Sequence, residues 1–217
     1  MDTTTIIKNL HPLEIKVLLK YSAADKLTAE KLQKDLDYKE GHANQAFSWL
    51  GGKGLVEVVE KIPHTFYEIT DLGRAFAKDG TVEERAAAFV KENGAKTLPE
   101  LASGLKIENK DIGSAFGLLS KEGVLKMNEE KKAEYTGKPL PASIATTAAL
   151  LKKAAAQESG QLDLTTLSKD EQTVIATLAK KRGAADSPFK TIERETVVYK
   201  LCGNYKEVVS DLKKSGI

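Results

Sequence analysis

An internal repeat is the feature of this sequence that most constrains its fold. Residues 28–56 align without a gap on residues 97–125, at an offset of 69 positions, and seven of the 29 aligned pairs are identical. The identical residues are of kinds that commonly build a core, a helix cap or a turn. They are Thr28/Thr97, Leu32/Leu101, Leu36/Leu105, Ala46/Ala115, Phe47/Phe116, Leu50/Leu119 and Gly54/Gly123. Because such self-similarity marks a duplicated structural unit, we expect two copies of one small fold.

The first copy has the pattern of three short helices. Pro12 suits the first turn of a helix within LHPLEIKVLLKY, and Thr28 suits the N-cap of a second helix, TAEKLQKDL. A third helix is expected from about Glu40 to Leu50. One face of that third helix is apolar and is expected to be buried: Ala43, Ala46, Phe47 and Leu50.

Two β-prone runs follow these helices, LVEVVE and TFYEIT. The intervening Lys61-Ile62-Pro63-His64 predicts a turn, so the two runs are expected to form a hairpin, after which Thr70 caps a closing helix. Three helices followed by a hairpin is the order of a winged helix-turn-helix module. The expected fold class is therefore α+β, mainly α with small β-hairpins, arranged as tandem winged helix-turn-helix modules.

Three modules are expected along the chain. Winged-helix module 1 spans residues 1–79, and winged-helix module 2 spans residues 80–138 with VLKMNEEKKAEYTG as its wing. Residues 139–217 form a helical linker and a winged-helix-like module 3, and the prolines of GKPLPAS mark its start. In this third module FKTIE and ETVVYKL are expected to pair across Arg194. Its core is expected to include Val174, Ile175 and Leu178.

Composition disfavours several classes of protein. The single cysteine, Cys202, cannot form an internal disulfide or a zinc thiolate cluster, and the three histidines are scattered. No Ser/His/Asp or Cys/His arrangement has catalytic spacing, and GGKG is not followed by the Ser or Thr of a phosphate loop. No apolar run is long enough to span a bilayer, and the amino terminus lacks a signal-peptide pattern. We therefore expect a cytoplasmic protein with no membrane contact, no metal site and no catalytic residue.

The charge distribution favours nucleic-acid contact through local patches only. The chain has 33 basic and 31 acidic side chains, and residues 141–217 have 12 basic against 9 acidic ones. The candidates for RNA phosphate contact are Lys53, Lys61, Lys180, Lys181, Arg182, Lys190 and Arg194. The outer face of the third helix adds amide and hydroxyl groups, those of Asn44, Gln45 and Ser48. Each of these residues also fits an ordinary solvated surface, and Trp49 and Phe66 fit either a core or stacking on nucleobases.

Taken together, these motifs resemble a known family. LHPLEIKVLLKY, TAEKLQKDL, NQAFSWLGGKGLVEV, YEITDLGRAFAKDG and VEERAAAFV are similar, in this order, to the amino-terminal region of the archaeal and eukaryotic type of phenylalanyl-tRNA synthetase alpha subunit. In that family tandem winged modules bind tRNA, and a class II aminoacylation domain follows them and assembles with a beta subunit. The resemblance therefore implies a role in protein biosynthesis, with tRNA as a partner and the beta subunit reached through the catalytic part.

The chain departs from this family after Leu201, where CGNYKEVVSDLKKSGI leaves no room for the catalytic sheet. The resemblance then implies a noncatalytic tRNA-binding appendage without a cofactor of its own, because ATP, phenylalanine and magnesium would bind the catalytic part. Two other functions fit the same expected fold, a winged-helix DNA-binding transcription regulator and a tandem winged-helix protein-interaction scaffold. The absence of Arg and Lys from the outermost positions of the third helix counts against the DNA-binding regulator.

We predict that the purified chain does not activate phenylalanine, since no catalytic motif was found in its sequence. ATP–pyrophosphate exchange in the presence of phenylalanine is expected to stay at the level of a control without enzyme. Exchange above that level would contradict the noncatalytic interpretation.

Overall fold

Two units of contacting residues make up the computed structural model, which describes residues 2–180 and 187–216. Unit 1 comprises residues 1–64 and 194–217, and unit 2 comprises residues 65–193. The chain therefore leaves unit 1 and later returns to it, so unit 1 is discontinuous in sequence and unit 2 is continuous.

This division differs from the expected series of three consecutive modules. Residues 194–217 were expected in module 3, but they pack with the first stretch of the chain in unit 1. Residues 65–79 were expected in module 1, but they belong to unit 2. The physical reason is pairing between distant segments, because Tyr199 near the end of the chain forms an antiparallel bridge with Leu27 near its beginning.

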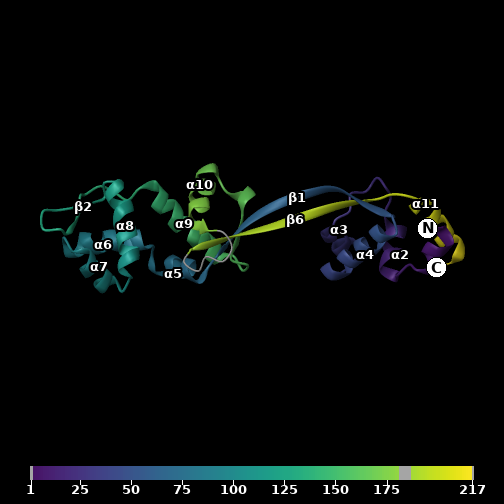
Figure 1. Ribbon diagram of the computed structural model, residues 1–217, viewed down its shortest axis with the longest axis horizontal. Coiled ribbons are helices and arrows are strands. Elements are labelled where there is room, and N and C mark those ends of the chain that lie inside the picture. Colours follow the sequence, from purple (N-terminus) through teal and green to yellow (C-terminus); the bar gives the residue numbers. More distant parts are fainter. Residues whose placement is uncertain (1, 181–186, 217) are drawn as a thin grey trace. The chain divides into compact units, whose positions relative to one another are not determined.

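The described elements of unit 1 are mostly helices (Figure 1). They are α1 (Thr3–Lys8), α2 (Pro12–Lys20), α3 (Ala29–Leu36), α4 (Glu40–Gly52) and α11 (Tyr205–Ser215), with parts of the strands β1 (Val56–Ile69) and β6 (Phe189–Leu201). Pro12 occupies the first turn of α2, and the side chain of Thr28 accepts a hydrogen bond from the Lys31 amide at the start of α3, as expected.

Unit 2 contains the second repeat copy and the elements that follow it. Its elements are α5 (Asp71–Asp79), α6 (Val82–Asn93), α7 (Leu98–Leu105), α8 (Asn109–Lys121), β2 (Leu125–Met127), β3 (Ala133–Tyr135), α9 (Ala142–Ala156), β4 (Gln161–Asp163), the 3-10 helix Leu164–Thr166, α10 (Lys169–Leu178) and β5 (Ala179–Lys180). The expected cap at Thr70 is confirmed, since its hydroxyl accepts a hydrogen bond from the Gly73 amide at 3.1 Å.

The core of unit 1 joins the beginning and the end of the chain. Phe47 of α4 is 2% exposed, and its ring stacks on that of Tyr199 in β6 with centroids 4.0 Å apart. Leu27 and Tyr199 exchange two backbone hydrogen bonds of 2.8 and 2.7 Å. Helix α11 packs against α1 and α2, and the Tyr205 hydroxyl accepts a hydrogen bond from the Ala23 amide. The carboxyl-terminal part of the chain is thus an integral part of unit 1.

The repeat is confirmed at the level of secondary structure. Helices α3 and α7 have bounds that differ by 69 positions, and so do helices α4 and α8. The connection between the two helices also matches, because Asp37 and Lys106 both adopt left-handed backbone with φ of 56°. Gly54 and Gly123 have φ of 71° and 75°, which favours glycine at the turn after the helix. Local conformation therefore repeats down to single residues.

The bridging residue before each copy shows where the two copies differ. Leu27 and Lys96 are also 69 positions apart, and each forms an antiparallel bridge, with Tyr199 and Ala133 respectively. Ala133 belongs to β3, which forms a short hairpin with β2 in the second copy. In unit 1 the corresponding strand is β6, which follows the repeat by more than a hundred residues.

The expected hairpin at Lys61-Ile62-Pro63-His64 is wrong, because these residues lie within the continuous strand β1. The expected wing across Arg194 is also wrong, because β6 continues through that residue. The two strands are neighbours in a sheet with the order β4-β1-β6-β5. Strand β4 pairs with β1 only at Phe66–Glu68, so Pro63 lies outside that pairing, and proline is tolerated where a strand has an open edge.

Unit 2 has two clusters of buried side chains. The first contains the second repeat copy and includes Leu101, Ile112 and Leu119, with Phe116 half-buried against it. The second lies among α5, α9, α10 and the sheet, and Ile175 is fully buried there with Val174 and Leu178 packed around it. The expected core residues of the last third are thus in a core, although that segment shares its unit with the second copy.

We predict that Phe47→Ala lowers the free energy of unfolding by about 3–5 kcal/mol, because it leaves a cavity in a closed core. Phe116→Ala is expected to have a smaller effect, since Phe116 is only half-buried. Urea unfolding should be followed by circular dichroism and by the fluorescence of Trp49, the single tryptophan, which reports on unit 1. Equal losses in the two variants would contradict the prediction.

Candidate nucleic-acid interface

Helix α4 separates a buried apolar face from an exposed polar one. Ala43, Ala46, Phe47 and Leu50 are all buried, as the sequence predicted. Asn44, Gln45 and Ser48 are exposed on the other side, so their amide and hydroxyl groups are accessible to a partner. This face carries no formal charge at those three positions, so it is suited to hydrogen bonds with base edges or phosphate oxygens.

Helix α8, the counterpart of α4, presents a different surface. Gly113, Ser114 and Gly117 are exposed, and a Cβ atom added at either glycine would meet nothing within 4 Å. The Ser114 hydroxyl donates a hydrogen bond to the Lys110 carbonyl within its own helix. This surface therefore allows close approach of a partner to the helix backbone and offers few side-chain groups.

An aromatic pair flanks the polar face of α4. Trp49 is 36% exposed, and its ring centroid lies 4.9 Å from that of His11, with the ring planes tilted by 52°. From the sequence, Trp49 fitted either a core position or an exposed one, and the structure places it at the surface. His11 was not among the sequence candidates. Phe66, the other aromatic residue considered for stacking, is half-buried in β1.

Lys53 is engaged in a buried ion pair rather than exposed for phosphate contact. Its Nζ lies 2.7 Å from Oε1 of Glu14, whose side chain is 1% exposed, while the Lys53 side chain is 17% exposed. The other Glu14 oxygen accepts a hydrogen bond from the His11 amide at 2.7 Å. Sequence reasoning did not identify Glu14 as the partner because the two residues are 39 positions apart.

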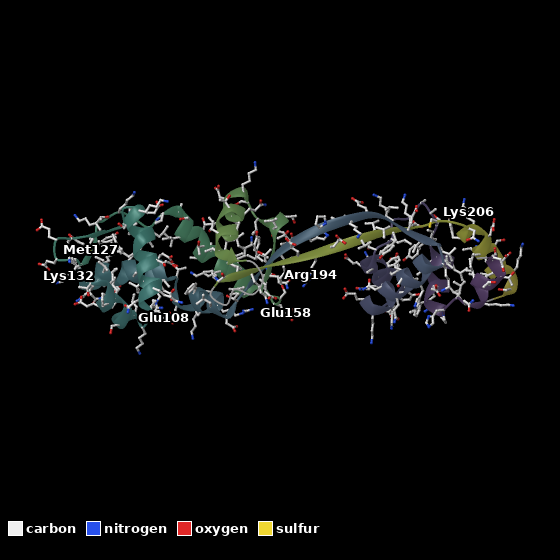
Figure 2. All side chains as sticks on the ribbon, in the orientation of Figure 1. Glu108, Met127, Lys132, Glu158, Arg194 and Lys206 are labelled. Carbon is white, nitrogen blue, oxygen red and sulfur yellow. The ribbon has the colours of Figure 1, made fainter. Side chains whose placement is uncertain are left out.

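The remaining basic candidates are distributed over both units. Lys61 is exposed in unit 1, with its Nζ 4.0 Å from a Glu195 carboxylate oxygen. Lys190 is exposed in unit 2, with its Nζ 2.6 Å from a Glu68 carboxylate oxygen. Arg194 is exposed on β6 (Figure 2).

The cluster predicted around residue 180 is described only in part. Lys180 is the last residue of β5, and its backbone pairs with Lys190 of β6. Lys181 and Arg182 lie outside the described residues. The structure therefore relates Lys180 to Lys190 through strand pairing.

The hairpin of β2 and β3 is a further basic and apolar surface in unit 2. Figure 2 shows Met127 and Lys132 at this hairpin, and Met127 is 43% exposed. Lys132 lies 3.1 Å from a Glu130 carboxylate oxygen, and Lys126 pairs in register with Glu134. These acidic neighbours reduce the positive charge of the hairpin, so it is a weaker candidate for phosphate contact than its lysines alone suggest.

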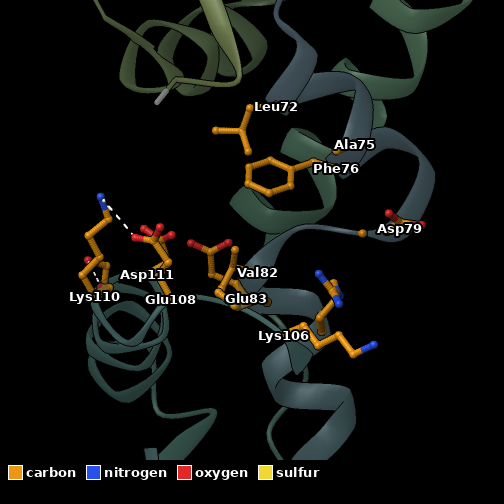
Figure 3. A pocket seen from close by; sticks show the side chains of 14 residues that line it. Leu72, Ala75, Phe76, Asp79, Val82, Glu83, Lys106, Glu108, Lys110 and Asp111 are labelled. Carbon is orange, nitrogen blue, oxygen red and sulfur yellow. Dashed lines mark hydrogen bonds and ion pairs between the residues drawn. The ribbon is translucent and has the colours of Figure 1, made fainter. Parts of the chain in front are cut away.

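A pocket of about 560 Å³ in unit 2 is lined by apolar side chains and by side chains of both charges. Leu72 and Phe76 of α5 and Val82 of α6 are among the apolar residues that line it (Figure 3). Carboxylates border the pocket, those of Asp79, Glu83, Glu108 and Asp111, alongside Arg85, Lys106 and Lys110. Because four carboxylates lie beside three basic side chains, the pocket offers no excess of positive charge for phosphate contact.

The titratable groups of residues 2–180 and 187–216 show few shifted pKa values. Burial, with a smaller effect of Glu57, raises the pKa of the Cys202 thiol, which disfavours the thiolate. Burial also raises the pKa of Tyr38 to about 12. Among residues 2–180 and 187–216, no group of three or more His, Cys, Asp or Glu side chains is placed to hold a metal ion. Within the same residues, no helix combines the length and apolar character needed to cross a membrane.

Comparison with known proteins relates the chain to one enzyme subunit. No protein-family model matches it. The phenylalanine–tRNA ligase alpha subunit of Treponema pallidum is 37% identical over an alignment of 246 positions. That alignment covers 100% of this chain and 44% of that protein. The chain is homologous over its whole length to phenylalanine–tRNA ligase alpha subunits.

Other ligase alpha subunits show the same relationship. The Borreliella burgdorferi alpha subunit is 33% identical over 211 residues, covering 97% of this chain and 39% of that protein. The Methanopyrus kandleri alpha subunit is 26% identical over 131 residues, covering 60% of this chain and 25% of that protein. The chain thus spans less than half the length of these relatives, and the resemblance inferred from the motifs is confirmed.

We predict that Lys53→Met lowers the free energy of unfolding by about 3–5 kcal/mol, because it leaves the buried carboxylate of Glu14 without its ammonium partner. Adding Glu14→Gln is expected to restore part of the loss, since an uncharged amide can still accept the His11 hydrogen bond. Urea unfolding followed by Trp49 fluorescence measures both variants. A Lys53→Met variant as stable as the parent but weakened in RNA binding would instead make Lys53 a phosphate ligand.

Proposed function

We propose that this chain is a noncatalytic tRNA-binding appendage of a phenylalanine–tRNA ligase alpha subunit. The observation that carries this proposal is the homology, which extends over the whole chain at 37% identity. The geometry supports it, because the outer face of α4 is polar, exposed and held on a rigid helix by a closed apolar core.

We further propose that each repeat copy is a winged helix-turn-helix unit. The order in the second copy is α6, the bridging residue Lys96, α7, α8 and the hairpin β2–β3. Unit 1 has the same order with α2, Leu27, α3 and α4, followed by β1 and β6 in place of the hairpin. In this arrangement α4 and α8 take the position of the helix that faces a nucleic acid.

Phosphate contact would come from basic side chains. The proposed set contains Lys61, Lys190 and Arg194 together with the cluster Lys180, Lys181 and Arg182. The ion pairs of Lys61 and Lys190 with glutamates are exposed, and such pairs contribute only about 0–1 kcal/mol, so a phosphate can replace the carboxylate at little cost. Lys53 is excluded from this set because it neutralises a buried carboxylate.

The activity and assembly of the whole ligase subunit belong to the proposal as well. Aminoacylation of tRNA, the binding of ATP, phenylalanine and magnesium, and assembly with a beta subunit would depend on the part of the relatives that this chain does not span. The proposed location is the cytoplasm, where tRNA is charged for translation. This chain would then contribute tRNA contact outside the acceptor end.

A protein-interaction scaffold is the second candidate. The pocket, which combines apolar side chains with side chains of both charges, and the glycine-rich surface of α8 favour a protein partner over RNA at those places in unit 2. A DNA-binding regulator is less favoured, because Asn44, Gln45 and Ser48 provide no cation for guanine contact. Titrating the chain with a tRNA transcript, a DNA duplex of matched length and the free beta subunit separates the three functions.

We predict that tRNA affinity falls with salt and that replacing Lys180, Lys181 and Arg182 by alanine flattens this dependence. Each lost phosphate contact is expected to reduce the slope of log affinity against log salt by roughly 0.7–0.9. Filter binding over a range of salt concentrations measures the slope. The matched control replaces three exposed lysines of α11, Lys206, Lys213 and Lys214, and is expected to change the slope less. An unchanged slope in a folded cluster variant would contradict the proposed phosphate site.

A further inference from the structure

We propose that Trp49, supported by His11, forms a stacking site for an unpaired nucleobase at the edge of α4. This inference rests on the proposed function, since it assigns a base contact within the proposed RNA-binding surface. It adds a site whose chemistry is the planar apolar face of an indole rather than charge.

The exposure of Trp49 is the first observation. Phe47 and Leu50 on the same helix are 2% and 0% exposed, whereas Trp49 is 36% exposed. An accessible indole offers a planar surface on which any of the four bases can stack. The part of the ring that remains exposed is therefore available for a ligand without a change in the core.

The second observation is that His11 is fixed beside the indole. His11 is the N-cap of α2, where its Nδ1 accepts a hydrogen bond from the Leu13 amide at 3.2 Å and its own amide donates to Glu14 at 2.7 Å. Glu14 is in turn held by Lys53. The ring that contacts Trp49 is thus anchored by the first turn of α2 and by a buried ion pair. Such anchoring reduces the conformational entropy that a ligand must remove on binding.

Neighbouring polar groups can recognise the edge of a stacked base. Gln45 lies four positions before Trp49 and His42 lies seven positions before it, so the three residues follow one strip along α4. Both Gln45 and His42 are exposed. The Gln45 amide provides a donor and an acceptor, which is what the hydrogen-bonding edge of a base requires.

The second repeat copy shows which part of this arrangement is special to unit 1. The position that corresponds to Trp49 is Leu118, which is 37% exposed. The repeat therefore places a large exposed side chain at the same outer position of α4 and α8, but only Trp49 is aromatic. A nucleobase distinguishes an indole from a leucine at this position, because stacking needs a π face.

Because Trp49 is the single tryptophan of the chain, its fluorescence reports directly on the proposed site. The full chain is titrated with a short single-stranded oligoadenylate and with a paired RNA duplex of the same length. Stacking predicts quenching by the oligoadenylate, and weaker quenching by the duplex, whose bases are already stacked.

Affinities are measured independently by the anisotropy of dye-labelled oligoadenylate and labelled tRNA transcript. Trp49→Leu is expected to weaken binding roughly 5- to 150-fold, while Trp49→Phe, which keeps a π face, retains most of the affinity. Neither variant is expected to change the salt slope, because stacking releases no counterions. Circular dichroism and urea unfolding establish that each variant is folded.

Two matched controls separate stacking from general loss of apolar surface. Leu118→Ala removes an equally exposed apolar side chain at the corresponding position of α8 and is expected to leave binding unchanged. His11→Asn keeps a good N-cap residue but removes the ring beside Trp49, so an intermediate loss of affinity is expected.

The outcomes distinguish this inference from the proposed function. Unchanged affinity of folded Trp49→Leu for both RNAs overturns the stacking site, and salt-dependent tRNA binding by the same variant leaves the proposed function standing. Quenching by oligoadenylate without tRNA binding supports the stacking site and overturns the proposed function. If neither RNA binds, the stacking site and the proposed function are both overturned. If only the beta subunit quenches the fluorescence, Trp49 belongs to a protein interface and the stacking site is overturned.

Discussion

The contact between Tyr199 and the segment around Leu27 and Phe47 is the interaction on which unit 1 depends. Tyr199 exchanges two backbone hydrogen bonds with Leu27 and stacks its ring on Phe47. One residue of β6 thus provides both the backbone partner of Leu27 and an aromatic contact for the core. Without β6, the bridging residue Leu27 would lack the strand that Ala133 supplies to Lys96 in the second copy. The position of α4, and with it the proposed RNA-binding face, follows from this closure.

Local features of the fold were predictable from the sequence, whereas distant pairings were not. The caps at Thr28 and Thr70, the buried face of α4 and the equivalence of the two copies are all set by interactions within a few residues. The strand β1 was mistaken for a hairpin because Pro63 indicates a turn when no partner strand is known. The partner, β6, lies more than a hundred residues away, and neither propensity nor periodicity contains information on that pairing.

The same division between local and distant information applies to the candidate site. The exposure of Asn44, Gln45 and Ser48 follows from helical periodicity and was predicted correctly. The engagement of Lys53 with Glu14 was not predictable, because it depends on how α2 packs against the end of α4. His11 had a local signal that was overlooked, since a residue before proline that is followed by Glu at the third helical position is a capping-box pattern.

The discontinuity of unit 1 has a consequence for how the protein is made on the ribosome. Residues 65–193 form a continuous unit whose two clusters of buried side chains consist of residues from within that range, so these clusters are synthesised before β6 is complete. Unit 1 cannot close until Tyr199 and Tyr205 have left the exit tunnel, although its first 64 residues are synthesised first. Unit 1 is therefore expected to close after unit 2, although most of its residues precede unit 2 in the sequence. During that interval Phe47 lacks the Tyr199 ring that stacks on it in the folded unit.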